Sequence, residues 1–229
     1  MEPTLYRQDN LEKTKNITEW SGAFGIYKLS KTAIMKNLKT ILSLAVIEGL
    51  ATILYVIIEV GAKNNSGVRD LIQLIFILIN SLISGTLILA MIKGVDNKTI
   101  NVTEAYSTVF SKAADVVIVS ILYSLISLIS LFLLIIPAFF IIPRVYLSVY
   151  FVLDTDMGPL DAIKASWEST RGHVSKIYGI LGVNILILLL SITVIGIIAT
   201  VYFGFMYYAA SAVFYRYITR VNTSDPKIV

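Results

Sequence analysis

The chain has 229 residues, of which 56% are hydrophobic and 15% are charged, and its mean hydropathy is +0.79. This composition is too apolar for an ordinary soluble domain and is typical of a protein that crosses a membrane several times. Because the chain has one histidine and no cysteine, disulfides, His-rich or thiolate metal sites and cysteine nucleophiles are excluded.

Six apolar stretches follow a polar N-terminal segment. We expect residues 1–28 to be cytoplasmic, residues 29–217 to form a membrane domain, and residues 218–229 to be a cytoplasmic tail. The stretches lie approximately at 38–60, 70–92, 115–136, 137–153, 174–195 and 196–215. Each is near the ~20 residues that a helix needs to span a bilayer. The sequence therefore predicts an all-α, polytopic protein with six transmembrane helices.

Basic residues are distributed unevenly among the connections. Sixteen of the 19 Lys and Arg residues lie before the first stretch, after the sixth, or in the second and fourth connections. This count includes the basic residues at the ends of the stretches that border these segments. The opposite side has only Lys63 and Arg69. The positive-inside rule then predicts a multi-pass protein of the cytoplasmic (inner) membrane with both termini in the cytoplasm. This bias and attraction to anionic lipids account for the net charge of +4, so we expect membrane lipids as partners and no nucleic acid.

Similar short segments precede three pairs of stretches. They are LSKTAIMKNLKT at 29–40, VTEAYSTVFSKA at 102–113 and PLDAIKASWEST at 159–170. The last two match Glu104 with Asp161, Ala105 with Ala162 and Phe110 with Trp167, and Ala33 falls on the same alanine position. Each segment is typical of a short amphipathic helix at the cytoplasmic side, followed by a membrane hairpin. We therefore expect three repeated units; chance similarity of amphipathic helices is the alternative.

Two charged residues lie inside the predicted spans. Glu48 in the first stretch and Arg144 in the fourth are each about 15 Å from the cytoplasmic end, at 1.5 Å per residue. A single charge at that depth costs at least ~2.5 kcal/mol. We therefore expect an ion pair between them. In the alternatives, each is hydrated or snorkels separately, or Glu48 is protonated.

Other polar residues and prolines recur within the spans. In lipid, such side chains turn inward, either as helix-packing contacts or as the lining of a polar interior. The candidates are Asn80, Ser84, Ser120, Ser124, Ser127 and Asn184. Pro143 removes a backbone donor and should kink the fourth helix. We consider Pro137 and Pro143 as a hinge, with a plain structural kink as the alternative.

The segment SWESTRGH leads into the fifth stretch. Its Trp167, Arg171 and His173 would lie at the level of the lipid headgroups and are candidate headgroup contacts. A cationic anchor at the start of the helix is the alternative. The sequence contains no HExxH, GxSxG or GxxxxGK[ST] motif, so we expect no catalytic residue, no metal, no cofactor and no enzymatic activity.

The second half of the chain contains Pro137, Pro143 and Arg144, then DAIKASWESTRGH, then a glycine-broken hairpin that ends at Tyr215. In this order, the motifs resemble a broad group of bacterial multi-helix membrane proteins of unknown function, which includes the membrane domain attached to some glycerophosphoryl diester phosphodiesterases. The resemblance covers about 90 of the 229 residues. It implies a membrane fold in the inner membrane. It transfers no catalytic residue, because the phosphodiesterase reaction requires a separate barrel domain with acidic and histidine ligands.

We therefore expect a non-enzymatic membrane protein of the bacterial envelope. It would bind lipid, or a partner membrane protein, through a polar interior and the cytoplasmic-face helices. The alternative is a small transporter or channel in which Glu48 and Arg144 line the path. A path needs continuous polar lining to both faces, whereas the apolar outer halves of the predicted helices indicate a cavity open mainly to the cytoplasm.

Overall fold

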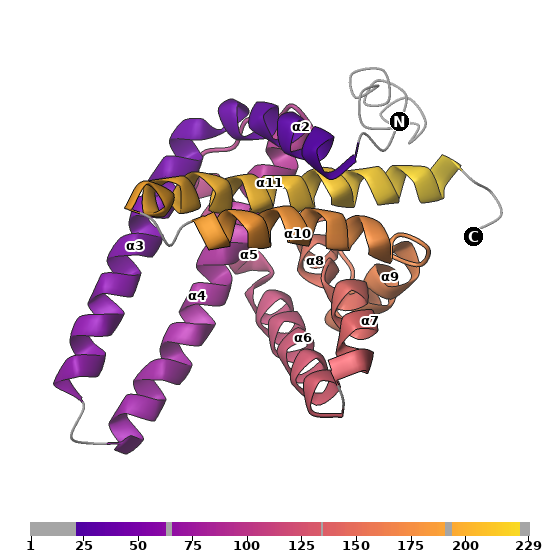
Figure 1. The fold of residues 1–229 in the computed structure, drawn as a ribbon. Helices are drawn as coiled ribbons and strands as arrows, with labels where there is room; N and C mark the ends of the chain where they lie inside the picture. Colours follow the sequence, from indigo (N-terminus) through magenta and orange to yellow (C-terminus); the bar gives the residue numbers. More distant parts are fainter. Residues whose placement is uncertain (1–21, 63–65, 134, 191–193, 225–229) are drawn as a thin grey trace.

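The computed structural model describes residues 22–62, 66–133, 135–190 and 194–224 (Figure 1). Within them, residues 133, 135–136, 187–190, 194–203 and 220–224 are described by their backbone alone. All the regular secondary structure in these ranges is helical, which confirms the all-α prediction. Most of the predicted N-terminal segment, and the end of the predicted tail, lie outside the described residues.

The first part of the fold is a short helix followed by a long hairpin. Helix α2 (Gly22–Lys36) meets α3 (Leu38–Gly61) at Asn37, and α4 (Ser66–Val95) returns antiparallel to α3. Figure 1 shows this hairpin projecting from the level at which α2 and α11 lie. Large apolar side chains are exposed along α3 and the first half of α4, as expected of helices that face lipid.

The second part begins with α5 (Val102–Ser111), whose N-cap Asn101 accepts a hydrogen bond from the Glu104 amide. Helix α6 (Ala113–Leu133) follows. The predicted fourth stretch is then divided between α7 (Ile135–Val145) and α8 (Ser148–Asp154). Pro143 lies inside α7 and lacks the amide that would extend the helical ladder, so the predicted kink takes the form of a break two residues later.

The third part consists of α9 (Pro159–Ser169), α10 (Val174–Leu190) and α11 (Val194–Ser224). Pro159 and Asp161 lie in the first turn of α9, where proline and an acidic side chain are favourable. Gly172 has φ +79° between α9 and α10, a left-handed conformation that favours glycine.

Four segments of the described chain are long and apolar enough to cross a membrane. They are Leu38–Gly61, Ser66–Val95, Ala113–Phe132 and Pro137–Asp154. They correspond to the first four predicted spans, and they indicate a membrane-embedded protein. The described apolar part of α10, Val174–Leu186, is shorter than a full span.

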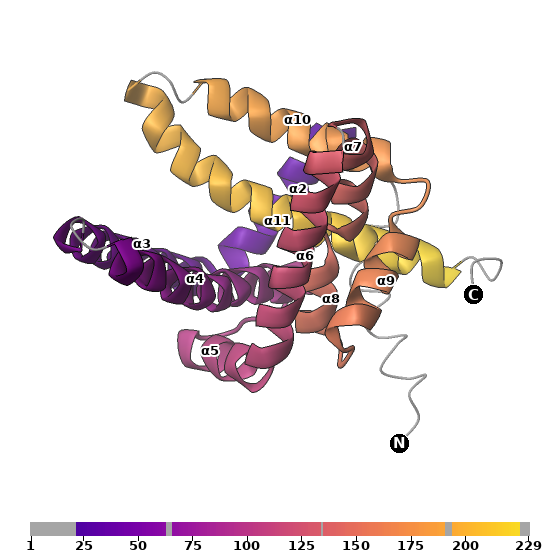
Figure 2. The ribbon, with the colours of Figure 1, turned by 90° about the horizontal axis from the view of Figure 1, so that it is seen from below.

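The core lies at one end of the molecule. There the last three turns of α4 pack against α2, α8 and the second half of α11. Leu89, Met91, Leu147, Phe214 and Tyr215 are all almost fully buried in this region. Seen from below in Figure 2, the α3–α4 hairpin and the α10–α11 pair diverge from this common core.

Candidate functional site

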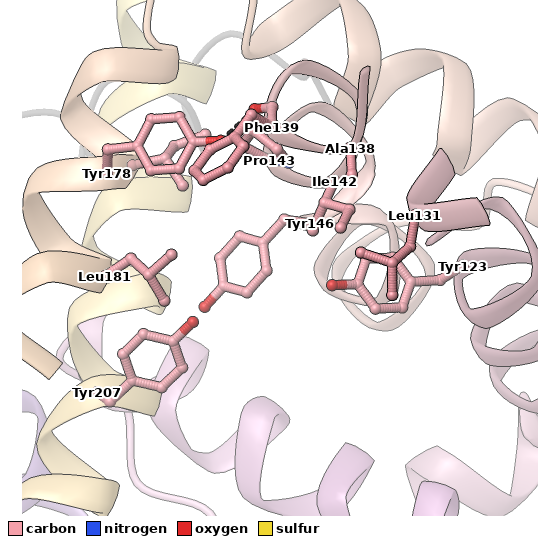
Figure 3. A pocket seen from close by; sticks show the side chains of 11 residues that line it. Tyr123, Leu131, Ala138, Phe139, Ile142, Pro143, Tyr146, Tyr178, Leu181 and Tyr207 are labelled. Carbon is pink, nitrogen blue, oxygen red and sulfur yellow. Dashed lines mark hydrogen bonds between the residues drawn. The ribbon is translucent and has the colours of Figure 1, made fainter. Parts of the chain in front are cut away.

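A cavity of about 330 Å³ lies between α6, α7, α10 and α11 (Figure 3). Its walls consist of apolar side chains and four tyrosines. The lining residues are Tyr123, Leu131, Ala138, Phe139, Ile142, Pro143, Tyr146, Ile177, Tyr178, Leu181 and Tyr207. The volume is at the lower end of the range of small-molecule sites, ~300–1,000 Å³, and the mainly apolar lining with few polar groups is also typical of them.

Hydrogen bonds hold the hydroxyl groups of Tyr146 and Tyr178 in the cavity wall. The Tyr146 hydroxyl is hydrogen-bonded to the Ser211 hydroxyl, and Ser211 also donates to the carbonyl of Tyr207 at 2.9 Å. In Figure 3 the hydroxyl ends of Tyr146 and Tyr207 point toward each other. The Tyr178 hydroxyl donates to the Phe139 carbonyl across the α7–α10 contact. The wall therefore presents fixed hydroxyl groups within an apolar surface.

Helix α9 satisfies the backbone groups that the α7–α8 break leaves open. The Ser166 hydroxyl donates to the Arg144 carbonyl at 2.7 Å and accepts from the Leu147 amide at 3.2 Å. The Thr170 hydroxyl donates to the same Arg144 carbonyl at 3.3 Å. Since Pro143 and Tyr146 flank the break and line the cavity, α9 holds this wall in place.

The predicted ion pair between Glu48 and Arg144 is absent from the described residues. The Arg144 guanidinium instead lies 4.9 Å from the centroid of the Trp167 ring on α9, a cation–π arrangement. The depth of Arg144 was counted along a straight helix, but α7 ends at Val145 beside α9. Glu48 is half-buried on α3, and neither charged residue lines the cavity.

The predicted intramembrane polar residues do not line the cavity either. Ser120 and Ser124 donate to carbonyls one turn earlier on α6, those of Val116 and Ser120, so their hydroxyls are used within the helix. The others are half-buried on three helices: Asn80 and Ser84 on α4, Ser127 on α6 and Asn184 on α10. Of the two hinge candidates, Pro143 is buried at the break, and Pro137 is half-buried in the first turn of α7.

The three predicted headgroup contacts meet at the corner between α9 and α10. Trp167 and Arg171 are exposed there. His173 is half-buried, with Nδ1 at 3.0 Å from the Arg171 carbonyl and its ring edge-on to Tyr217. The structure thus places Trp167 on α9, which supports the cavity wall, and Arg171 and His173 in the turn that follows it.

An ionic cluster that the sequence analysis missed joins α11 to the carboxyl ends of α4 and α8. Arg216 on α11 donates through Nε to Asp96 at 2.8 Å, and through its terminal nitrogens to both oxygens of Asp154 at 2.6 and 2.8 Å. The Tyr215 hydroxyl donates to Asp154 at 2.9 Å. Burial lowers the pKa of Arg216, but the hydrogen bonds and charges of Asp154 and Asp96 outweigh it and raise that pKa above its ordinary value.

A signal for this cluster is present in the sequence. Asp96 and Asp154 come just after the second and fourth predicted stretches, and Arg216 comes just after the sixth. The cluster could not be predicted from a local pattern, because its members are 58 to 120 residues apart in the chain.

A lysine next to the cluster fixes the end of α8. The Lys112 ammonium donates to the carbonyls of Val152 and Thr155, and it forms a 3.2 Å ion pair with Asp156. A cation at the carboxyl end of a helix is stabilising, because the last carbonyls lack partners within the helix.

Comparison of the chain with protein-family models, with curated proteins and with solved structures finds no match.

Proposed function

We propose that this chain is a non-enzymatic membrane protein of the bacterial envelope that binds a lipid in the cavity between α6, α7, α10 and α11. The observation that carries the proposal is the cavity itself, because its apolar walls suit a hydrocarbon chain. Each buried CH₂ group contributes about 0.8 kcal/mol to binding. The hydroxyl groups fixed in the wall are suited to orient an ester or hydroxyl group of the lipid.

The cavity favours lipid binding over transport. A transport path lined by Glu48 and Arg144 would need these residues in one polar passage. They do not meet, and neither lines the cavity. The corner formed by Trp167, Arg171 and His173 offers amphipathic and cationic side chains to lipid headgroups. Trp167 lies on α9, which supports the cavity wall, and Arg171 and His173 follow in the turn before α10. This arrangement fits a protein that acts on or within the lipid layer.

We further propose six membrane spans in three repeated units, with both termini in the cytoplasm and the chain in the inner membrane. In chain order, the short helices α2, α5 and α9 each precede two longer helical stretches. The matched alanines Ala33, Ala105 and Ala162 are at most 2% exposed. The matched aromatic residues Phe110 and Trp167 are both exposed. A relation to the membrane domain attached to glycerophosphoryl diester phosphodiesterases, and binding of a partner membrane protein, also remain proposals.

A substitution that fills the cavity tests lipid binding. Leu181→Trp adds a bulky ring to the lining, whereas Leu186→Trp makes the same change at a position of α10 that is 52% exposed. Native mass spectrometry of gently purified protein should find retained lipid in the wild type and in Leu186→Trp, and at least ~5-fold less in Leu181→Trp because the added ring occupies the volume of the chain.

The complementary variant Leu181→Ala enlarges the cavity and should shift the retained lipid toward longer chains. Leu181→Ala also tests the cavity if Leu181→Trp does not fold. Absence of retained lipid from the wild type contradicts the proposal. Equal retention by the two tryptophan variants contradicts it as well, since lipid would then be held elsewhere.

A further inference from the structure

A second cavity of about 420 Å³ lies at the corner between α2 and α3. It is lined by Met35, Lys36, Asn37, Leu38, Lys39, Thr40, Thr99 and Ile100. It shares no lining residue with the cavity between α6, α7, α10 and α11. Figure 1 shows α3 leaving this corner and running away from the core.

Hydrogen bonds to one buried side chain hold this pocket open. Asn37, only 3% exposed, donates to the carbonyls of Ala90 at 3.1 Å and Lys98 at 3.0 Å, and accepts from the Ile100 amide at 2.9 Å. Thr40 donates to the Ile100 carbonyl at 2.6 Å. The loop after α4 is therefore fixed against the corner, and the pocket is formed before any ligand arrives.

The pocket carries positively charged side chains. Lys36 and Lys39 both line it and are exposed, and neither forms an ion pair with a residue in the part of the chain that the structure describes. Thr99, also exposed, adds a hydroxyl to the opposite wall. Two ammonium groups and a hydroxyl are donors that suit a phosphate group.

An apolar surface continues from the pocket along α3. Leu42, Val46, Leu50 and Ile53 follow Lys39 at helical spacing and are each 53–61% exposed. The opposite face, with Ile41 and Leu44, is buried in the core. A cationic pocket at the end of an exposed apolar stripe has the polarity of a phospholipid, with its charged group at one end and its chains at the other.

We propose that the corner pocket binds the phosphate of an anionic phospholipid whose acyl chains lie along this stripe of α3. The phosphate oxygens accept hydrogen bonds from Lys36 and Lys39, and the chains cover the apolar side chains below. This site is independent of the lipid proposed for the other cavity. It holds a lipid on the outer surface of the bundle by its headgroup.

The test compares two double variants of equal charge change. Lys36→Gln/Lys39→Gln removes the pocket cations, while Lys28→Gln/Lys31→Gln removes two exposed lysines of α2 that lie outside the pocket. Thermal unfolding of the full chain is followed in mild-detergent micelles containing phosphatidylglycerol, phosphatidylcholine or added inorganic phosphate. A ligand that binds the folded state raises Tm, and the rise measures its apparent affinity.

Phosphatidylglycerol should raise the Tm of the wild type and of the Lys28/Lys31 variant by more than phosphatidylcholine does, because a lipid held in the other cavity by its acyl chain would respond to both lipids alike. The Lys36/Lys39 variant should show an affinity for phosphatidylglycerol roughly tenfold lower or more. An equal loss in both double variants would mean general electrostatic attraction and overturn the proposal. The proposal is also overturned if inorganic phosphate alone gives the same rise in Tm, because the pocket would then bind a free anion. It is overturned as well if phosphatidylglycerol raises the Tm of the wild type no more than phosphatidylcholine does. The Leu181→Trp variant should keep the excess response to phosphatidylglycerol over phosphatidylcholine, which separates this site from the other cavity.

Discussion

Arg216 lies between two carboxylates where α4, α8 and α11 come together. Its side chain is 15% exposed, and those of Asp96 and Asp154 are 17% and 16% exposed, so water screens the three charges only partly. Breaking such a buried pair is costly, because the partner that remains keeps an uncompensated charge. At this cluster, one guanidinium pairs with two carboxylates.

Arg216→Met should therefore destabilise the folded protein by about 3 kcal/mol. Equilibrium unfolding in mild detergent measures this loss. Adding Asp154→Asn to Arg216→Met should restore part of the stability, because it removes one of the uncompensated charges. The control is Lys164→Met, whose pair with Asp161 is 3.9 Å long and exposed and should change stability by less than ~1 kcal/mol. If Arg216→Met and Lys164→Met have equal effects, the cluster is not a stabilising contact.

Gly94 determines how closely α2 packs on α4. A Cβ built at Gly94 would lie 2.3 Å from the carbonyl oxygen of Ala33, a backbone atom of α2. Only glycine therefore allows the two helices to approach this closely. The contact involves Ala33, one of the three buried alanines of the proposed units.

Gly94→Ala should cost about 1–3 kcal/mol, because α2 must move away from α4 to admit the methyl group. The matched control is Gly182→Ala on α10, where an added Cβ meets nothing within 4 Å. There the higher helix propensity of alanine should leave stability unchanged or slightly increased. The Tm of each variant in the same detergent measures the two changes in stability. Equal Tm for the wild type and Gly94→Ala would mean that the helices do not pack at this distance.

The helices were the part of the fold that could best be predicted from the sequence, and α7 shows the limit of such predictions. Apolar stretches and the Pro159–Asp161 start of α9 are local patterns, so they predicted helices at the right places. The break between α7 and α8 depends on Ser166 and Thr170, which bond to the Arg144 carbonyl from 22 and 26 residues away. The prediction that Glu48 pairs with Arg144 assumed an unbroken fourth helix. It is wrong because that helix is broken after α7.

The candidate sites needed information that no local pattern contains. The cavity walls come from α6, α7, α10 and α11, and most of its lining residues are ordinary apolar side chains with no chemical signature. The polar residues singled out from the sequence bond within their own helix or lie elsewhere. The corner around Trp167, Arg171 and His173 was predictable because its residues are neighbours in the chain.

At the scale of the whole molecule, the exposed apolar surface and the distribution of charge determine how the protein lies in a membrane. The α3–α4 hairpin projects from the core with large apolar side chains exposed on both helices, which suits a lipid surrounding (Figures 1 and 2). Positively charged residues concentrate at the other end of these helices, near α2 and α5. The orientation that we propose rests on this asymmetry, because positively charged connections are retained in the cytoplasm.

Single-cysteine variants test this orientation directly, since the chain has no cysteine of its own. Ser66→Cys places the cysteine at the exposed start of α4, directly after the turn of the first hairpin. Met157→Cys places it in the exposed connection between α8 and α9. In intact spheroplasts, a membrane-impermeant maleimide should label Ser66→Cys and leave Met157→Cys unlabelled until the membrane is permeabilised. The reverse pattern would invert the topology. Labelling of both sites from outside would mean that an even number of spans separates them, whereas the proposed arrangement has three, and the arrangement of hairpins with cytoplasmic ends would be wrong.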